Sequence, residues 1–293
     1  MESPQSKRRR ISGGSGVGGG NSLWEDINPE ILGGLIFIKI KPVDELIRVI
    51  PFVCKTWNEV INGPYCWNDI DIQQWCRRCH DIDRIDNAVR KLIPRSIGVL
   101  RSLSVYMLSN AAFAFLVNCE RCLKVLQMPM SEVTDRMVEK HAESLKMLTT
   151  LDISNCNKIT CKGLEVLGKC CTSLVHLKRN LSPPLWDYNT GVLATKKDDG
   201  EALVIADTMR SLRNLELGYG SMTDLGLDAI LNKCKNLIHL DILGCYGVRL
   251  EGDLEDRCDQ IMSFRGPWDE EYHDEEYDES SEEGESGSDS DGV

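Results

Sequence analysis

The chain has 293 residues and a formal net charge of −12, from 34 Lys and Arg against 46 Asp and Glu. Thirteen of the acidic residues lie in 266–293, which has no Lys or Arg, so the rest of the chain is close to neutral. A nearly neutral chain of this kind lacks the basic face that binding to duplex DNA requires, and we expect no direct contact with nucleic acid. The most apolar run, 31–40, is interrupted by Lys39 and is shorter than the ~20 residues of a membrane span, so we expect no membrane partner.

Both ends of the chain are predicted to be disordered. Residues 1–22 are rich in glycine, and 263–293 are dominated by Asp, Glu, Ser and Gly, compositions that cannot bury enough apolar surface to fold. The first segment carries a basic cluster typical of a nuclear import signal, with a merely solubilising tail as the alternative. Its residues are Lys7, Arg8, Arg9 and Arg10. We therefore expect the protein in the nucleus, the cytoplasm or both.

Residues 23–68 are predicted to form three short helices. Apolar residues recur there at helical spacing, and a proline lies near the start of each helix, where its missing N–H does no harm. The apolar sets are Ile27, Ile31, Leu35 and Ile36, then Val43, Leu46, Ile47 and Ile50, then Val53, Trp57, Val60 and Ile61. Residues 69–98 are predicted to be a linker or capping segment, with a short strand at 68–72 and a helix over 81–93.

Residues 99–262 repeat a leucine pattern. The pattern L-x-x-L-x-(apolar) begins at Leu100, Leu123, Leu148, Leu174, Leu212 and Leu237. Most of the spacings fall in the 20–29 residue range of leucine-rich repeats, in which a strand and a helix alternate. The fourth copy is degenerate because Arg179 replaces its last apolar residue, and the long spacing after it indicates an insertion near 182–200. The predicted fold is therefore α/β, a solenoid of about six repeats behind a short helical module.

The cysteines are expected to be free thiols in a reducing compartment. Cys119 and Cys122 precede a repeat much as Cys171 and Cys234 do, which favours buried thiols over a zinc site. We expect no metal and no cofactor. The chain contains none of the common catalytic motifs, so we expect no enzyme activity.

Residues 24–72 resemble an F-box, the helical module that docks on a Skp-family adaptor. The resemblance is carried by Trp24, by the segments 27–32 and 53–57, and by 64–71, which reads P-Y-C-W-N-D-I-D. The repeats resemble the cysteine-containing leucine-rich repeats of F-box proteins, as in 148–171. An F-box followed by such repeats resembles a plant F-box/leucine-rich-repeat (F-box/LRR) protein.

The resemblance implies a substrate-recognition subunit of an SCF (Skp–cullin–F-box) ubiquitin ligase. The F-box would bind the Skp-family adaptor, and through it the cullin and RING subunits. The repeats would present a protein substrate for ubiquitination and proteasomal degradation. The residues expected to bind the adaptor are Ile27, Pro29, Ile31, Leu35, Val53, Cys54 and Trp57.

The substrate is expected to bind at outward positions of the repeat strands, which alternate with the core positions, and at the insertion. The candidates are Ser104, Tyr106, Gln127, Asp152, Lys178, Trp186, Glu216 and Asp241. The alternative is a repeat scaffold for protein interactions that has no role in a ligase.

Overall fold

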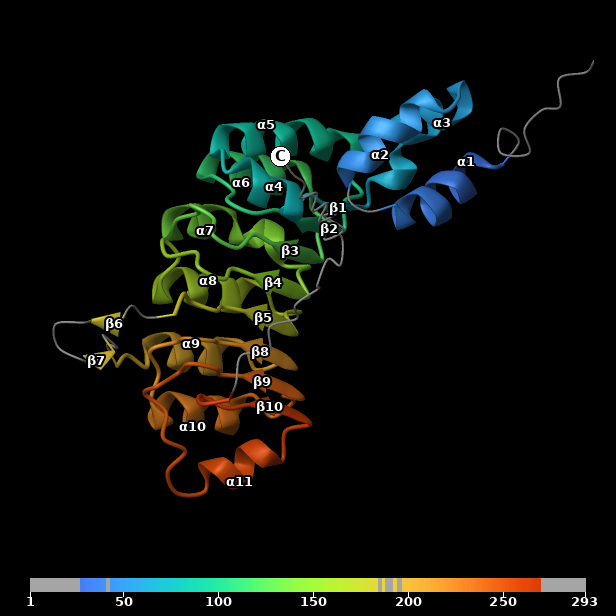
Figure 1. Ribbon diagram of the computed structural model, residues 1–293. Helices are drawn as coiled ribbons and strands as arrows, with labels where there is room; N and C mark the ends of the chain where they lie inside the picture. Colours follow the sequence, from blue (N-terminus) through green and yellow to red (C-terminus); the bar gives the residue numbers. More distant parts are fainter. Residues whose placement is uncertain (1–26, 41–42, 184–185, 188–191, 194–196, 270–293) are drawn as a thin grey trace, which may run out of the picture.

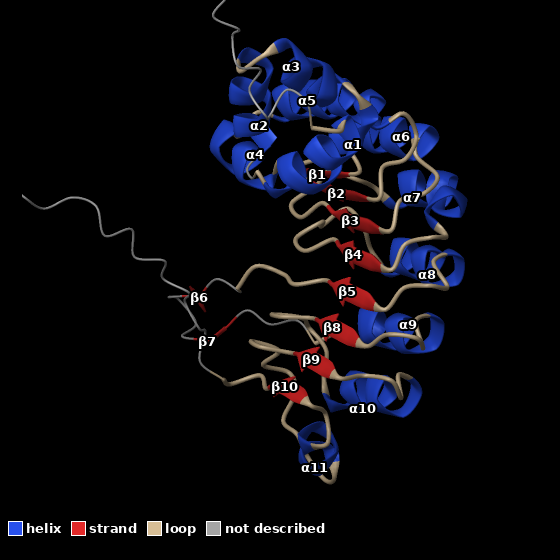
Figure 2. Cartoon of the chain, turned by 90° about the vertical axis from the view of Figure 1, so that its right-hand side faces the viewer, coloured by secondary structure: helices blue, strands red, loops and turns tan. Residues whose placement is uncertain are grey.

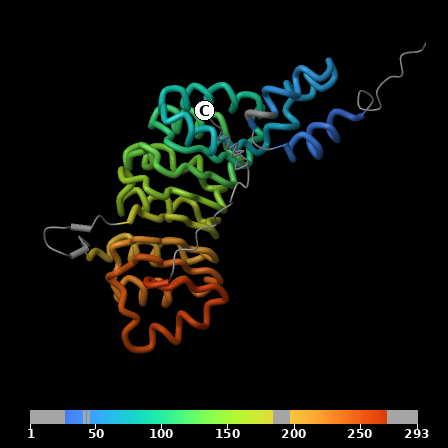
Figure 3. Tube along the Cα trace, viewed as in Figure 1, coloured from blue at the N-terminus to red at the C-terminus, as the bar shows by residue number. Residues whose placement is uncertain are grey.

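The computed structural model describes residues 27–40, 43–183, 186–187, 192–193 and 197–269. Within these residues a helical module leads into a curved stack of short parallel strands (Figure 1). The strands follow one face of the stack and the repeat helices follow the other (Figure 2). The Cα trace runs in chain order from the module to the far end of the stack (Figure 3). The predicted α/β class is confirmed, in the form of an open parallel sheet covered by helices.

The N-terminal module consists of short helical turns. They are α1 (Pro29–Ile31), the π-helical turn η1 (Leu32–Ile36), the 3-10 turn η2 (Phe37–Lys39), α2 (Val43–Val49), η3 (Ile50–Phe52), α3 (Lys55–Asn62) and η4 (Pro64–Cys66). The first predicted helix is therefore divided into three pieces. Gly33 accounts for part of this, because a Cβ atom there would lie 2.7 Å from the Cβ of Tyr65 and 3.1 Å from Cγ1 of Val60. Only glycine lets this turn approach α3 and η4 so closely.

The main sheet has eight parallel strands in the order β1-β2-β3-β4-β5-β8-β9-β10. They are β1 (Asp69–Asp71), β2 (Ser102–Ser104), β3 (Val125–Gln127), β4 (Thr150–Asp152), β5 (His176–Lys178), β8 (Asn214–Glu216), β9 (His239–Asp241) and β10 (Ser263–Arg265). The middle residue of each strand lies in register with its neighbours and points into the core. This column is Ile70, Leu103, Leu126, Leu151, Leu177, Leu215, Leu240 and, partly buried at the end, Phe264.

The sheet extends one strand further at each end than the predicted repeats. β1 lies within 68–72, where a short strand was predicted in the linker or capping segment, whereas β10 lies in 263–293, which was predicted to be disordered. Neither strand carries the leucine pattern: each has a single apolar residue between polar ones. Pairing with a neighbouring strand, rather than local periodicity, makes these segments β-structure.

The helices behind the sheet alternate with the strands. They are α4 (Gln73–Cys79), α5 (Ile82–Leu92), η5 (Ile93–Ser96), α6 (Asn110–Cys119), α7 (Asp135–His141), η6 (Ala142–Leu145), α8 (Cys161–Cys170), α9 (Gly200–Thr208), α10 (Asp224–Lys233) and α11 (Leu254–Asp259). None of the helices in the described part of the chain is long and apolar enough to cross a membrane. In the predicted insertion, β6 (Trp186–Asp187) and β7 (Val192–Leu193) form a separate antiparallel pair.

Acidic side chains of one repeat cap the helix of the next. The Asp199 carboxylate accepts hydrogen bonds from the backbone N–H groups of Thr223 (2.7 Å) and Gly226 (3.0 Å) at the start of α10. Asp135 makes the equivalent bonds to α8. These contacts satisfy N–H groups that have no partner inside their own helix and join neighbouring repeats.

We expect the variant Asp199→Ala to lose about 1–2 kcal/mol of unfolding free energy, because it removes this cap and leaves backbone donors unpaired. Urea unfolding followed by circular dichroism measures the loss. The control is Glu139→Ala, an exposed acidic residue of α7, which should change stability by less than about 0.5 kcal/mol. Equal unfolding midpoints for the two variants would contradict the capping role.

Arg179, which makes the fourth copy of the leucine pattern degenerate, is a core residue. Its side chain is only 3% exposed and forms an ion pair with Glu201, with 2.9 Å between Nη2 and Oε1. The guanidinium also donates to the backbone carbonyls of Ile153 (3.4 Å), Cys156 (3.3 Å) and Ile159 (3.0 Å). One charged side chain thereby satisfies carbonyls of the preceding repeat at a place where the other copies have an apolar residue.

All thirteen cysteines are free thiols. Cys171 and Cys234 are buried as predicted, but Cys119 and Cys122 are exposed, so the prediction of buried thiols was wrong for that pair. Cys171 and Cys234 each lie three residues before the first leucine of the next copy. Before Leu123 that position is occupied by Glu120, which is buried. Its carboxylate accepts hydrogen bonds from Ser96 Oγ (2.7 Å) and Leu100 N–H (3.3 Å), while burial raises the pKa of the Glu120 carboxyl.

Buried thiols make the fold sensitive to alkaline pH. Burial raises the pKa of seven of them from the ordinary value of 9.0 to between about 11 and about 12. They are Cys66, Cys76, Cys156, Cys171, Cys234, Cys245 and Cys258. In the window above pH 9 the unfolded chain has lost thiol protons that the folded chain still holds, so stability falls as the pH rises.

We expect the unfolding free energy, measured in urea with a reductant present, to be lower at a pH of about 10 than at about 8. The variant Cys171→Ala should show a shallower decline, because one of the titrating thiols is gone. An unfolding free energy that does not change over this range would contradict the assignment.

Candidate functional site

The N-terminal module exposes large apolar side chains to solvent. Phe52 is 84% exposed and Leu35 is 63% exposed, and three further apolar residues of the module are about half exposed. We call the set Ile31, Leu35, Val49, Phe52 and Val53 the apolar face. Soluble proteins seldom expose so many apolar residues on so small a unit unless a partner covers them.

The apolar face is built by two parts of the module. Ile31 and Leu35 are about one helical turn apart along α1 and η1, and both elements pack against α3. Val49, Phe52 and Val53 lie in and beside η3, the turn that joins α2 to α3. The module stands at the β1 end of the sheet, with α1, α2 and α3 projecting from the stack (Figure 1).

The structure separates the predicted adaptor residues into two groups. Pro29, Ile31, Leu35 and Val53 are exposed and available to a partner, whereas Ile27 is half-buried against the core.

Cys54 and Trp57 instead support the module from within. The Cys54 sulfur accepts a hydrogen bond from the backbone N–H of Trp57 (3.5 Å) and so caps α3. The Trp57 ring meets Phe37 edge to face at a centroid distance of 5.0 Å. Their role in this structure is to hold α3 in place.

Sequence reasoning missed Val49 and Phe52. The core stripe of α2 and η3 comprises Val43, Leu46 and Ile50, which are all buried. Val49 and Phe52 are apolar residues off that stripe, and this is the signal that could have identified them.

A second candidate surface runs along the sheet. The last residues of the eight strands lie side by side in register and form a row of polar side chains that we call the polar ladder. It consists of Asp71, Ser104, Gln127, Asp152, Lys178, Glu216, Asp241 and Arg265. The ladder brings together six of the eight predicted substrate residues.

Much of the polar ladder is paired with itself. Lys178 contacts Glu216 (2.8 Å) and Arg265 contacts Asp241 (3.3 Å). Ser104 donates to Gln127 Oε1 (2.7 Å) and is buried, and Asp152 is also buried. Ser104 and Asp152 are therefore poor candidates for direct substrate contact.

The two remaining candidates lie off the ladder. Tyr106 follows β2 and stacks under the guanidinium of Arg77, whose Cζ is 4.6 Å from the ring centroid. Trp186 belongs to β6, and its side chain lies outside the described residues, as do Lys7, Arg8, Arg9 and Arg10 of the basic cluster.

The chemistry of both surfaces suits protein binding. Among the described residues there is no group of three or more His, Cys, Asp or Glu side chains placed to hold a metal ion. What the structure offers is an apolar face at one end and a row of mixed charge along the sheet. Such a pattern is typical of protein–protein interfaces.

Comparison with known proteins decides the family. No family model matches the chain. The F-box protein FBW2 of Arabidopsis thaliana is 39% identical over 245 residues, which cover 83% of this chain and 75% of that protein. The putative F-box/LRR-repeat protein 23 of the same plant is 30% identical over 83% of this chain and 53% of its own length. The chain belongs to the plant F-box/LRR proteins.

Further relatives agree with this assignment. The Arabidopsis thaliana F-box protein SKIP19 is 29% identical over 85% of this chain and 78% of that protein. The predicted resemblance to plant F-box/LRR proteins is thus confirmed. F-box proteins are in general non-catalytic substrate adaptors, which agrees with the absence of common catalytic motifs from this F-box/LRR sequence.

Proposed function

We propose that this F-box/LRR protein is the substrate-recognition subunit of an SCF-type ubiquitin ligase. The observation that supports the proposal most strongly is the apolar face, which lies on the segment that resembles an F-box. A Skp-family adaptor with a complementary apolar groove would cover these side chains and connect the chain to cullin and RING subunits. Burial of a few well-placed aromatic and aliphatic residues is enough to hold such an interface.

The polar ladder is the proposed site for a protein substrate. Its partly buried members carry both signs of charge, and charged groups at an interface contribute to partner selection more than to raw affinity. The protein would perform no chemistry itself. Holding a substrate near a ubiquitin-charged enzyme raises the effective concentration of the substrate lysine, and this accelerates transfer.

Co-purification tests the proposal. The intact chain and a chain lacking 23–68 are each produced with a Skp-family adaptor. We expect one adaptor per intact chain and none on the shortened chain. If a folded intact chain captures no adaptor, the protein would instead be a repeat scaffold without a ligase role.

We propose that the basic cluster directs import into the nucleus. A fluorescent fusion in which Lys7, Arg8, Arg9 and Arg10 are all changed to Ala should lose nuclear enrichment. Equal nuclear signal in both fusions would refute this proposal.

A further inference from the structure

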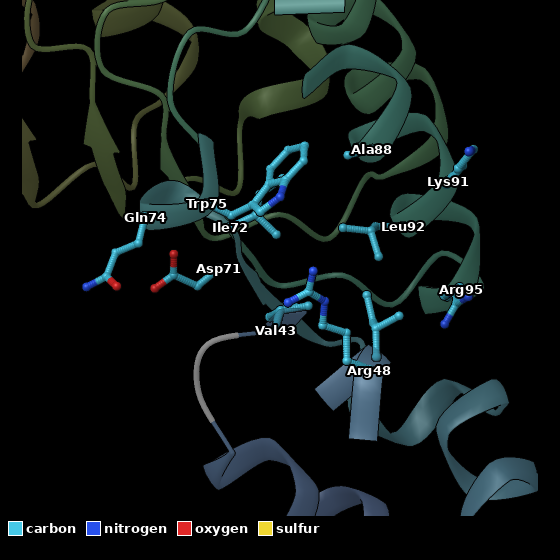
Figure 4. A pocket seen from close by; sticks show the side chains of 11 residues that line it. Val43, Arg48, Asp71, Ile72, Gln74, Trp75, Ala88, Lys91, Leu92 and Arg95 are labelled. Carbon is cyan, nitrogen blue, oxygen red and sulfur yellow. The ribbon is translucent and has the colours of Figure 1, made fainter. Parts of the chain in front are cut away.

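A cavity of about 510 Å³ opens where the N-terminal module meets the first helices of the solenoid (Figure 4). Its walls come from α2, α4 and α5, elements that lie on either side of β1 in the sequence. Most of the lining is apolar, and the lining side chains include the indole ring of Trp75. The apolar residues are Val43, Ile47, Ile72, Trp75, Ala88 and Leu92.

Cations surround this apolar wall. Arg48, Lys91 and Arg95 line the cavity, and an adjoining hollow that shares Arg48 and Trp75 adds Arg78 and Arg84. We call Arg48, Arg78, Arg84, Lys91 and Arg95 the basic rim. Among the residues whose side chains the structure describes, Asp71 is the one acidic residue that lines the two hollows. An apolar wall lowers the local dielectric, so an anion bound here is attracted more strongly than at an open surface.

The chain itself contains a strongly acidic segment. Residues 270–293 contain 12 acidic residues and no Lys or Arg. They follow β10 and lie outside the described residues. The run that includes Glu282, Glu283 and Glu285 places several carboxylates close together in the sequence, opposite in charge to the cations of the basic rim.

The segment is long enough to reach the cavity. β10 and β1 are seven strand spacings apart, which is about 34 Å at ~4.8 Å per spacing. Twenty-four residues in extended form span up to about 80 Å. About ten residues after Asp269 are enough to cover the distance, so the acidic residues beyond them can lie over the rim.

We propose that the acidic segment 270–293 docks on the basic rim of this cavity. The contact would connect the far end of the solenoid to the helical module and cover the cavity between α2, α4 and α5. The polar ladder has only two cations, Lys178 and Arg265, and each lies beside a carboxylate of a neighbouring strand. This inference does not depend on the proposed function, since it needs no adaptor.

Carbodiimide cross-linking of the full chain tests the proposal, because the reagent joins a carboxylate to an amine in direct contact. At low protein concentration and low salt, we expect Lys91 to be the main lysine that cross-links to peptides from 270–293. In the double variant Arg48→Glu/Arg84→Glu the yield at Lys91 should fall about tenfold, because two cations of the rim now repel the segment. Lys91 itself stays in place as the reporter.

The matched control reverses two exposed charges elsewhere, in the variant Arg121→Glu/Lys124→Glu, and should leave the yield at Lys91 unchanged. A second measurement, which needs no substitution, raises the salt concentration with the unmodified chain. The cross-linking yield at Lys91 should fall, because salt screens the attraction between the carboxylates and the cations. The proposal is overturned if the segment cross-links mainly to lysines away from the cavity, such as Lys7 or Lys178. A yield at Lys91 that is the same in both variants would also overturn it.

Discussion

Aspartate at both Leu35 and Phe52 is expected to abolish capture of a Skp-family adaptor by a chain that still folds. Both side chains are mainly exposed, so the change should cost the isolated chain little stability. In a complex the same positions would place two charges in an apolar interface that excludes water. We expect adaptor affinity to fall at least about 100-fold, as measured by calorimetry on the purified proteins.

The matched control for this double variant is Met262→Asp. Met262 is 86% exposed and lies at the opposite end of the solenoid, so it tests whether any exposed apolar residue would have the same effect. We expect normal adaptor binding for the control and normal circular dichroism for both variants. Undiminished adaptor binding by the folded Leu35→Asp/Phe52→Asp chain would contradict the proposal that the apolar face binds the adaptor.

Replacement of Arg179 by alanine is expected to destabilise the solenoid strongly. It would remove the guanidinium donor from the Ile159 carbonyl and leave Glu201 without its partner, while the carbonyls of Ile153 and Cys156 would keep only their backbone donors. Breaking a buried ion pair from one side costs about 3–5 kcal/mol, and Glu201 is partly exposed, so we expect the lower end of that range. Urea unfolding measures the cost.

Two further variants test whether the ion pair between Arg179 and Glu201 contributes more to stability than an exposed ion pair does. Lys169→Ala removes one partner of an exposed ion pair with Glu165 and should cost less than about 0.5 kcal/mol. The double variant Arg179→Leu/Glu201→Leu restores an apolar residue at the repeat position and should recover much of the loss, because an apolar pair can replace a buried ion pair. If Arg179→Ala is as mild as Lys169→Ala, the buried arginine has no structural importance.

The order of strands and helices in the repeats could be predicted from the sequence, because each copy of the leucine pattern marks one strand and a helix follows it. Local periodicity did not reveal β10, whose strand character depends on pairing with β9. The sequence marked Arg179 as a departure from the leucine pattern. Spacing could not show the partners in the folded chain that explain why a charged residue stands there.

The candidate site was predicted in part. The resemblance to an F-box assigned Leu35 and Val53 to the adaptor-binding surface, and both are exposed in the structure. The same resemblance assigned Cys54 and Trp57 to that surface, and it gave no sign that these two residues also hold the module together. Phe52 was missed because it lies off the periodic stripe, although an apolar residue in that place is itself a sign of a partner.

The most direct test of the central claim is hydrogen exchange on the intact chain with and without a Skp-family adaptor. If the module docks on the adaptor and leaves the sheet open for a substrate, exchange should slow in 29–62 and stay unchanged in the strands between Ser102 and Arg265. Unchanged exchange in 29–62, or protection confined to the strands, would contradict the claim that the apolar face binds the adaptor.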